Sequence, residues 1–484
     1  MPVIVEEILN YINGSWQAAS SGKWLDNIEP STGNVYSRLP DSDESDVNLA
    51  VDSASEAFKG WSALTARERS EYMLRIADLI DRDHEKLAAA ESQDNGKPVK
   101  LARRVDIPRA SANMRFYATA ILHYASESHI QPGSMINYTV RSPHGVAACI
   151  SPWNLPLYLF TWKIAPALAA GNTVVAKPSE LTPATAYLFS RLCGEAGLPP
   201  GVLNIVHGTG VKAGSSLISH PDVPVISFTG GTATGRHISG IAAPMFKKLS
   251  LELGGKNPNI VFEDCDFDEA VKKSVESSFA NQGEICLCGS RILVQQSIYE
   301  KFLEAFTDRT KSLKVGDPQE DNVQLGALVS EQHLRKVMSY VELAKSEGGN
   351  VVAGGDRVKL TGRCSGGFFH EPTVITGLRM GCRTNQEEIF GPVVTITPFS
   401  DEEEAVKLAN YTSYGLSSTV WTQDLNRAHS VAHRLQAGIV WVNTWLLRDL
   451  RTPFGGVKNS GVGREGGWEA LDFFTEPKNI CIRL

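Results

Sequence analysis

The stretch GVAACISPWNLPLYLFTWKIAPALAAGNTVVA, residues 145–176, decides the fold. Two runs of small and branched apolar residues, 145–150 and 172–176, flank a helical run from Leu157 to Ala170. A strand, a helix and a second strand in this order predict two parallel strands joined by a crossover. Neither strand alternates between apolar and polar residues, which is typical of a sheet covered on both faces. The stretch therefore predicts an α/β fold.

The same alternation continues on the C-terminal side. It predicts a helix over 183–196, strands over 202–206 and 225–228, and a second β/α series from Asn259 to about Val440. Within that series, residues 291–294, 350–352 and 392–396 are predicted strands. At 484 residues the chain exceeds what one hydrophobic core supports, so two or three domains are expected. Both series indicate parallel sheets covered by helices.

The flanking segments have other patterns. Residues 8–40 predict strands and turns, with a hairpin at 11–16 and another turn at 29–34. Helices are predicted from Ser45, over 65–93 and over 106–125. The polar, turn-rich segment 127–142 predicts a protruding hairpin. Residues 478–484 predict a terminal strand, which could pair with the edge of another subunit.

Bulk composition restricts the partners and the compartment. The net charge is −7 and no long lysine or arginine run occurs, which argues against nucleic acid or an anionic membrane surface as a partner. The first residues lack the pattern of a secretory signal or a transit peptide, and no 18-residue apolar run occurs. We therefore expect a cytoplasmic protein.

Eight cysteines are spread thinly along the chain, which indicates reduced thiols rather than a disulfide framework. Cys286 and Cys288 are too close together for the usual zinc spacing, and no histidine pair accompanies them. No metal site is expected.

Cys286 is the most informative of these cysteines. It lies in a loop of small residues, 279–288, downstream of a turn, 249–257, that carries Glu252 beside two glycines. A thiol attacks only as thiolate, and a carboxylate can activate either the thiol or a water that follows. A lone cysteine is more often a buried small hydrophobe. The pairing nevertheless predicts a nucleophile and a base that meet across one cleft.

Glycines at two βα turns are candidates for a nucleotide-binding site. A doubly wound sheet favours a dinucleotide, but the usual Gly-x-Gly-x-x-Gly fingerprint is not clean, because Gly214 comes one residue too late after Gly208 and Gly210. Gly230 and Gly231 open a helix, and backbone N–H groups there could face a pyrophosphate. Alternatively, these are packing glycines.

Seven motifs then occur in order at fitting spacing. They are Ser151-Pro152-Trp153-Asn154-Leu155-Pro156, Lys177-Pro178-Ser179-Glu180, Phe228-Thr229-Gly230-Gly231, Leu251-Glu252-Leu253-Gly254-Gly255-Lys256, Gly283-Glu284-Ile285-Cys286, Glu387-Glu388-Ile389-Phe390-Gly391-Pro392 and Pro453-Phe454-Gly455-Gly456. With these motifs the chain resembles the aldehyde dehydrogenase superfamily over essentially its entire length. It departs from the family pattern at Gly231, where serine is more usual, and at Glu284, where glutamine is more usual.

The resemblance implies an α/β aldehyde dehydrogenase fold, with two doubly wound parallel-sheet domains and a small β oligomerisation arm. By likeness, residues 1–122 and 143–254 form the NAD-binding domain and 255–440 the catalytic domain. Residues 123–142 and 468–484 form the arm, and 441–467 a substrate loop that returns to the cofactor domain. A homo-oligomer is expected, with dimer and tetramer both open.

The resemblance also implies roles for single residues. Cys286 attacks an aldehyde, Asn154 holds the oxyanion, and Glu252 activates the water that hydrolyses the thioester. A carboxylate at Glu180 would accept from ribose hydroxyls and repel a 2′-phosphate, which favours NAD over NADP. The residues implied to bind the cofactor are Lys177, Glu180, Trp153, Phe228, Gly230, Gly231, Leu253, Glu388 and Phe390.

The substrate loop, together with residues 106–109 and 280–288, resembles the subgroup that oxidises 2-aminomuconic and 2-hydroxymuconic semialdehydes, products of aromatic and tryptophan (kynurenine) breakdown. These substrates carry a carboxylate remote from the aldehyde, and a guanidinium binds a carboxylate at two points. Arg109 and Arg448 are the predicted ligands, with Arg451 as the next candidate and Trp445 as a pocket wall. Structural ion pairs are the alternative role for these arginines.

Three other functions stay open. A retinal or other long-chain aldehyde dehydrogenase would lack a working arginine pair. A CoA-acylating enzyme would pass the thioester to CoA, whereas Glu252 favours water. A catalytically silent binding protein would not need Asn154, Glu252 and Cys286 together. The sequence does not separate an amino from a hydroxy substituent on the substrate.

Overall fold

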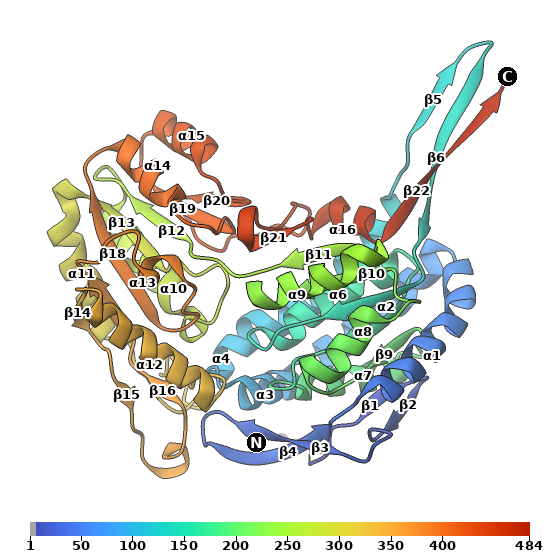
Figure 1. The fold of residues 1–484 in the computed structure, drawn as a ribbon, viewed down its shortest axis with the longest axis horizontal. Helices are drawn as coiled ribbons and strands as arrows, with labels where there is room; N and C mark the ends of the chain where they lie inside the picture. The colour runs from blue at the N-terminus through green and yellow to red at the C-terminus, as the bar shows by residue number, and fades with distance from the viewer. Residues whose placement is uncertain (1–5) are drawn as a thin grey trace.

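The computed structural model describes residues 6–484 as two α/β lobes with a projecting β arm (Figure 1). The predicted strand–helix–strand unit is confirmed, as β7 (Val146–Ile150), α6 (Pro156–Ala169) and β8 (Thr173–Lys177). Within the described residues, no helix is both long enough and apolar enough to span a membrane.

The first lobe is built on an eight-stranded sheet of order β2-β1-β9-β8-β7-β10-β11-β21. Its remaining strands are β1 (Asn10–Ile12), β2 (Ser15–Gln17), β9 (Leu203–Ile205), β10 (Val225–Thr229), β11 (Lys248–Glu252) and β21 (Gly461–Val462). The five strands from β9 to β11 are parallel. The chain runs outward from β7 to β9 and then returns to start β10 on the other side of β7. This switch point brings the loops after β7 and β10 to one crevice, where open α/β sheets bind ligands.

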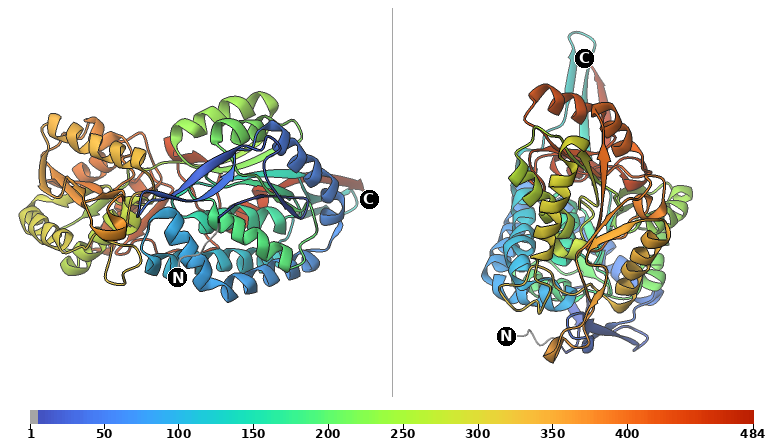
Figure 2. Two further views of the ribbon diagram at one scale, coloured as in Figure 1. Left: turned by 90° about the horizontal axis from the view of Figure 1, so that it is seen from below. Right: turned by 90° about the vertical axis from the view of Figure 1, so that its left-hand side faces the viewer.

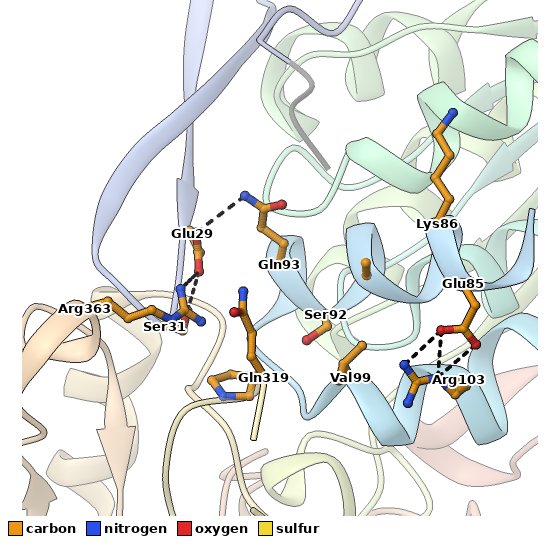
Figure 3. Close-up of a pocket in the computed structure, with 12 residues that line it drawn as sticks. Glu29, Ser31, Glu85, Lys86, Ser92, Gln93, Val99, Arg103, Gln319 and Arg363 are labelled. Carbon is orange, nitrogen blue, oxygen red and sulfur yellow. Dashed lines mark hydrogen bonds and ion pairs between the residues drawn. The ribbon is translucent and has the colours of Figure 1, made fainter. Parts of the chain in front are cut away.

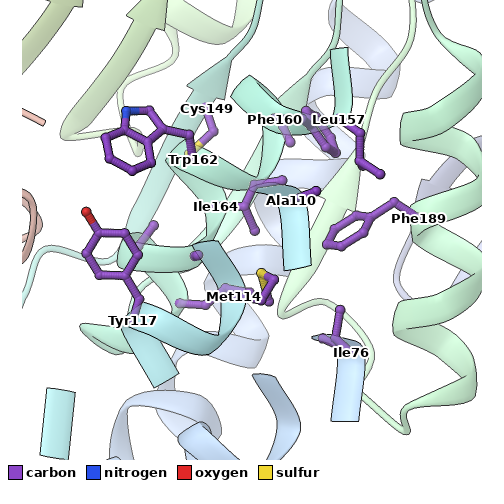
Figure 4. Close-up of a cluster of buried hydrophobic side chains, with 14 of the residues drawn as sticks. Ile76, Ala110, Met114, Tyr117, Cys149, Leu157, Phe160, Trp162, Ile164 and Phe189 are labelled. Carbon is purple, nitrogen blue, oxygen red and sulfur yellow. The ribbon is translucent and has the colours of Figure 1, made fainter. Parts of the chain in front are cut away.

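Helices cover both faces of this sheet. They are α1 (Glu44–Ala63), α2 (Ala66–Arg82), α3 (His84–Asn95), α4 (Val99–Leu101), α5 (Ile107–Ala120), α7 (Ala184–Glu195), α8 (Ser215–Ser219) and α9 (Thr232–Ala242). Figure 4 shows the larger core, where Ile76, Met114, Phe160 and Phe189 of α2, α5, α6 and α7 interdigitate. Side chains of α1, α8 and α9 fill the core on the opposite face. Because α6 is buried along its whole length, it is a fixed support for the loop that precedes it.

The second lobe holds a seven-stranded sheet of order β14-β17-β18-β13-β12-β19-β20. The strands are β12 (Pro258–Val261), β13 (Arg291–Gln295), β14 (Asn350–Ala353), β17 (Thr373–Thr376), β18 (Val393–Phe399), β19 (Ser417–Trp421) and β20 (Ile439–Val442). Only β14 is antiparallel to its neighbour. The covering helices are α10 (Phe267–Phe279), α11 (Tyr299–Lys311), α12 (Glu331–Ser346), α14 (Glu402–Asn410) and α15 (Leu425–Arg434). Two doubly wound sheets were predicted, and both are present.

The arm is a three-stranded sheet of β5 (Ser128–Gln131), β6 (Met135–Pro143) and β22 (Thr475–Arg483), and it projects from the first lobe (Figure 2). The terminal strand pairs with β6 of its own chain from Thr475 opposite Pro143 to Arg483 opposite Met135. Because β22 is an edge strand of this sheet, its pairing with the edge of another subunit stays a prediction.

Smaller elements complete the chain. They are β3 (Trp24–Glu29), β4 (Asn34–Pro40), β15 (Arg357–Val358), β16 (Phe369–His370), α13 (Arg383–Gln386) and α16 (Gly467–Phe473). The helical run predicted over 65–93 is two helices, because the chain turns at Asp83, which leaves the helical conformation. The next predicted helix begins with a π turn, Ala102–Asp106, before α5.

Candidate active site

The loop that carries Cys286 is held in an unusual backbone conformation. Asn281, Gln282 and Gly283 are consecutive left-handed residues, with φ of 52°, 56° and 73°. Gln282 fixes this turn, since its amide donates to Ala327 O (3.3 Å) and accepts from Gly326 N (3.2 Å). Such strain persists only where the surroundings hold it. The turn places Cys286 between the two lobes.

Cys286 lies on the walls of two cavities. The larger, of about 510 Å³, also contains Glu252, Arg109, Arg448 and Trp445 in its wall. The smaller space, of about 20 Å³, lies between Cys286 and residues 388–391. A thiol in this position can be reached from one side by a substrate and from the other by a second reactant.

Asn154 is brought close to the nucleophile. It follows β7, and its Nδ2 donates to Glu284 O at 2.9 Å, two residues before Cys286. Its own carbonyl accepts from Asn281 Nδ2 at 3.0 Å and from Lys97 Nζ at 2.9 Å. An amide nitrogen carries two N–H groups, so one remains for an oxyanion formed at Cys286.

Glu252 ends β11 on the same cavity wall as Cys286 and is only 3% exposed. Its Oε1 is buried and has no hydrogen-bond partner among residues 6–484. Burial and then the nearby Glu465 carboxylate raise the pKa of Glu252 well above its usual range. Burial, followed by the charges of Glu252 and Glu388, raises the pKa of the Cys286 thiol, and Arg448 opposes that shift. Both shifts favour the neutral form of the group, the carboxylic acid of Glu252 and the thiol of Cys286.

Two charged residues beside Glu252 were missed in the sequence. Lys163 Nζ lies 2.7 Å from Glu465 Oε1, and Ser227 Oγ donates to the same oxygen at 3.0 Å. Both side chains are buried, so this ion pair sets the electrostatic environment of Glu252. Lys163 could have been recognised from the sequence, because it is the only charged residue of the mainly apolar α6. Glu465, its partner far along the chain, carries no comparable sequence signal.

Arg109 and Arg448 both line the large cavity and lie over the same ring, that of Trp162. The Arg109 guanidinium lies 5.5 Å from the Tyr158 ring centroid and 5.9 Å from that of Trp162. Arg448 lies 3.9 Å from the Phe454 centroid, and its Nη1 donates to Tyr158 Oη at 2.6 Å. Within the described chain, no carboxylate lies within 4.0 Å of either guanidinium. In addition, Arg109 Nε and Nη2 are buried there without a hydrogen-bond partner.

Arg451 was the next candidate for a substrate ligand, and its position in the structure does not support that role. Its side chain is 80% exposed and forms a two-point ion pair with Asp449, at 2.6 Å for the Nη2–Oδ2 contact. It does not line the cavity. Because this local ion pair turns the Arg451 side chain toward solvent, Arg451 is not a ligand for the substrate carboxylate. Trp445, by contrast, is buried in the cavity wall and donates from Nε1 to Leu287 O at 3.0 Å.

The predicted cofactor residues gather around the switch point. Phe228 lies in β10, one residue before its end, and a Cβ at Gly230 would overlap its ring, so only glycine permits this close approach. Gly231 is the N-cap of α9 without a side-chain cap, and nothing lies within 4 Å of a Cβ added there. The first N–H groups of α9 thus remain available to a phosphate. Leu253 packs beneath this helix, against Gly235.

Other cofactor candidates lie on either side of this turn. Lys177 Nζ, buried at the end of β8, donates to Pro178 O (3.0 Å) and faces Glu180 Oε2 (3.3 Å). Across the crevice, Glu388 Oε1 accepts from Gly255 N at 2.8 Å. The Phe390 ring meets the Trp153 ring edge-on, with centroids 5.3 Å apart. A dinucleotide fits this arrangement: the carboxylates of Glu180 and Glu388 can accept from ribose hydroxyls, and the uncapped start of α9 can receive a phosphate. The rings of Trp153 and Phe390 form an aromatic wall beside them.

A second cavity, of about 530 Å³, lies between α3 and residues 318–363, away from Cys286 (Figure 3). Its arginines are already paired, Arg103 with Glu85 at 2.9 Å and Arg363 with Glu29 at 2.8 Å. Those charges are compensated within the protein, in contrast to those of Arg109 and Arg448.

Known proteins share this fold and these motifs. The aldehyde dehydrogenase family model matches residues 16–480. The chain is 52% identical over 477 residues to "2-aminomuconic semialdehyde dehydrogenase" of Danio rerio, covering 98% of each chain. It is 47% identical over 486 residues to "2-hydroxymuconic semialdehyde dehydrogenase" of Pseudomonas sp. (strain CF600), covering 99% of this chain and 100% of that one. The chain belongs to the aldehyde dehydrogenase family.

A solved relative supports the same assignment. The NAD+ complex of an aldehyde dehydrogenase from Bacillus cereus superposes with a TM-score of 0.97 at 40% identity, over 99% of this chain and 97% of that one. The predicted family and fold are therefore confirmed.

Proposed function

We propose that this enzyme oxidises 2-aminomuconate 6-semialdehyde, an aldehyde with a remote carboxylate, to the acid with NAD as oxidant. The observation that carries the proposal is the pair Arg109 and Arg448, which face the same cavity as Cys286 without a counter-ion from residues 6–484. Four relatives named for 2-aminomuconic semialdehyde are at 52% identity, and a fifth, from Pseudomonas sp, is at 44%. The relative named for 2-hydroxymuconic semialdehyde, at 47%, makes that compound the second candidate.

Electrostatics favours an anionic substrate. A guanidinium that is partly removed from water costs free energy unless an anion compensates it. A substrate carboxylate would supply that anion to both arginines and accept two-point hydrogen bonds. An uncharged chain such as retinal would leave both cations unpaired in an aromatic wall, which disfavours the long-chain aldehyde alternative.

In this proposal the arginines orient the substrate so that its aldehyde carbon lies at Cys286. Sγ forms a bond to that carbon as the thiol proton leaves to solvent, and the carbonyl oxygen becomes an oxyanion. The Asn154 amide and the Cys286 N–H donate to it, and one such donor contributes about 3–4 kcal/mol. The charge of Arg448 favours the thiolate needed for attack.

Bound NAD supplies the acceptor for the hydride that leaves the tetrahedral adduct, so that a thioester remains on Cys286. Glu252, when ionised, then removes a proton from a water that attacks the thioester carbon. The carbon–sulfur bond breaks, the thiol is restored and a carboxylic acid departs. The position of Glu252 on the cavity wall supports water, rather than CoA, as the acceptor.

The residues proposed to hold NAD follow from the fit at the crevice. The α9 N-terminus at Gly230 and Gly231 would receive the pyrophosphate. Lys177 and Glu180 would meet the adenosine ribose, where the Glu180 carboxylate disfavours a 2′-phosphate. Glu388, with Phe390, would meet the other ribose. Trp153 and Leu253 complete the walls, with Phe228 beneath the turn.

Assembly and location are part of the proposal. Ile130, Ile136 and Ile482 lie opposite one another across the three strands of the arm, so they share one face. Ile130 and Ile482 are exposed on the single chain. An apolar face on a projecting sheet supports a homo-oligomer built through the arm. We expect the enzyme to act in the cytoplasm.

A substrate panel tests the function. The purified protein should reduce NAD with 2-aminomuconate and 2-hydroxymuconate semialdehydes at a kcat/KM at least about 100-fold above that for hexanal, the worth of an anion bound by two arginines. Activity with NADP should be lower. A preference for hexanal or retinal would overturn the assigned substrate, whereas the absence of any aldehyde oxidation would overturn the catalytic roles.

A further inference from the structure

Three buried ionisable residues lie behind the active site and take no part in the chemistry above. Glu91 belongs to α3, Lys97 follows that helix, and Asp106 ends the π turn before α5. All three are 0% exposed. Buried charges are costly, so their retention calls for a specific role.

Lys97 connects two parts of the site. Its Nζ donates to Asp106 Oδ1 at 2.8 Å and to the Asn154 carbonyl at 2.9 Å. Nearby, Asn95 Nδ2 donates to Trp153 O at 3.0 Å. Asn95 and Lys97, at the end of α3, therefore hold the backbone of Trp153 and of Asn154, the oxyanion donor proposed above.

Glu91 completes the network from the other side. Its carboxyl accepts from Leu157 N, at 3.1 Å, in the first turn of α6. Asp106 Oδ2 is buried and has no donor when both carboxyls are ionised. Burial and then the charge of Asp106 raise the pKa of Glu91 to about 8. Burial raises the pKa of Asp106 as well, so a proton held by one of the two carboxyls would relieve their repulsion beside Lys97.

Asp106 also connects the network to the other end of the substrate. Arg109 follows it by three residues, one helical turn along the start of α5. The same network therefore contacts the backbone of Asn154, at the aldehyde end, and the turn that carries Arg109, at the carboxylate end.

We propose that Lys97, Asp106 and Glu91 form a buried positioning unit that fixes the distance between Arg109 and the Asn154 amide. Its consequence is selectivity for length: an acidic aldehyde reacts well when its carboxylate and aldehyde are separated by that distance. The inference rests on the roles proposed above for Arg109 and Asn154.

The test compares Lys97→Met with the wild-type enzyme on three aldehydes, 2-hydroxymuconate semialdehyde, the shorter succinic semialdehyde and hexanal. A misplacement of the amide by an ångström should lower kcat by about 10- to 100-fold per active site on all three. The KM for NAD should stay within about two-fold of wild type, and the wild-type preference for the longer acid over the shorter one should shrink at least about five-fold. Rates are divided by the amplitude of the NADH burst, which counts competent sites.

A kcat and a length preference that are unchanged in Lys97→Met would overturn the positioning unit. A wild-type enzyme that fails to prefer the acidic aldehydes over hexanal would instead overturn the proposed function. If Lys97→Met does not fold, two variants of Glu91 test the proposal instead. Glu91→Gln keeps a neutral donor to Asp106 and should retain wild-type kcat within about two-fold, whereas Glu91→Leu should lose about 10-fold or more. Equal kcat values for the two Glu91 variants would overturn the proposal.

Discussion

At the scale of single residues, the site holds a thiol and a carboxyl whose environment favours their neutral forms. The Cys286 thiol and the Glu252 carboxyl share one wall, and the charge of Glu252 contributes to the raised pKa of Cys286. This arrangement keeps the thiol from reacting indiscriminately. It also makes the second half of the reaction depend on the ionisation of Glu252.

Glu252→Gln should therefore keep the pre-steady-state NADH burst and slow the steady-state rate by at least about 100-fold, the usual contribution of a general base. In the unmodified enzyme, thioester hydrolysis should increase with pH, because the base works ionised and its pKa is raised. Stopped-flow absorbance measures the burst, and pH–rate profiles measure hydrolysis. Loss of the burst in the variant would place Glu252 in the first half of the reaction.

Tyr158 touches both arginines and was not predicted from the sequence. Tyr158→Phe keeps the ring under Arg109 and removes the hydroxyl that accepts from Arg448. We expect KM for a muconic semialdehyde to rise about 3- to 10-fold, the worth of one hydrogen bond to a charged group, with little change for hexanal. Equal increases for both aldehydes would show that the hydroxyl does not act through the carboxylate.

The motifs place Cys286, Glu252 and Asn154 in short, specific patterns, and their catalytic roles stay a prediction. They could not give the ion pair of Lys163 with Glu465, because those residues are far apart in sequence. Nor could they separate Arg448 from Arg451: both are near the same motif, and only the ion pair with Asp449 turns Arg451 away.

At the scale of elements, the order of strands explains the cofactor crevice without a glycine fingerprint. The loops after β7 and β10 meet because the chain reverses between these two strands. The strand–helix alternation predicted the parallel sheets but not this order of strands. It could not predict the break at Asp83 or the π turn at 102–106, which depend on tertiary packing.

The start of α9 offers a matched pair of variants. Gly230→Ala would place a methyl group on the Phe228 ring, whereas Gly231→Ser meets nothing within 4 Å. We expect the first to weaken NAD binding at least about 10-fold and to destabilise the fold by about 1–3 kcal/mol, the usual cost of overpacking. The second should leave both properties nearly unchanged, with a few tenths of a kcal/mol gained from a serine N-cap. Fluorescence titration and thermal unfolding measure these effects, and equal behaviour would contradict the close packing.

At the scale of the whole molecule, the arm projects away from both lobes (Figure 1). Cys286 lies on the wall of a cavity that residues of both lobes line. The domain bounds drawn from family likeness stay a prediction, although β11 ends at Glu252 in one sheet and β12 begins at Pro258 in the other. The pattern of the arm predicted its hairpin but not which edge the terminal strand would join.

The arm gives a prediction about assembly. Ile136→Glu places a charge in the centre of the apolar row with Ile130 and Ile482. Light scattering should show a shift toward a smaller species, because a buried unpaired carboxylate costs several kcal/mol at an interface. Met135→Glu, one residue away on the other face of β6, is the control. An unchanged mass for Ile136→Glu would place the interface elsewhere.

The most direct measurement is the specificity of Arg448→Ala, with Arg451→Ala in the same loop as its control. We expect Arg448→Ala to raise KM for 2-hydroxymuconate semialdehyde at least about 30-fold and KM for hexanal less than about three-fold, since only the acid binds the guanidinium through a carboxylate. Loss of the Arg448 charge beside the Cys286 thiol affects kcat for both aldehydes alike. Arg451→Ala should change neither KM value by more than about two-fold. Equal KM increases of Arg448→Ala on both aldehydes, or a larger effect of Arg451→Ala on the acid, would contradict the claim that the cavity recognises a carboxylate.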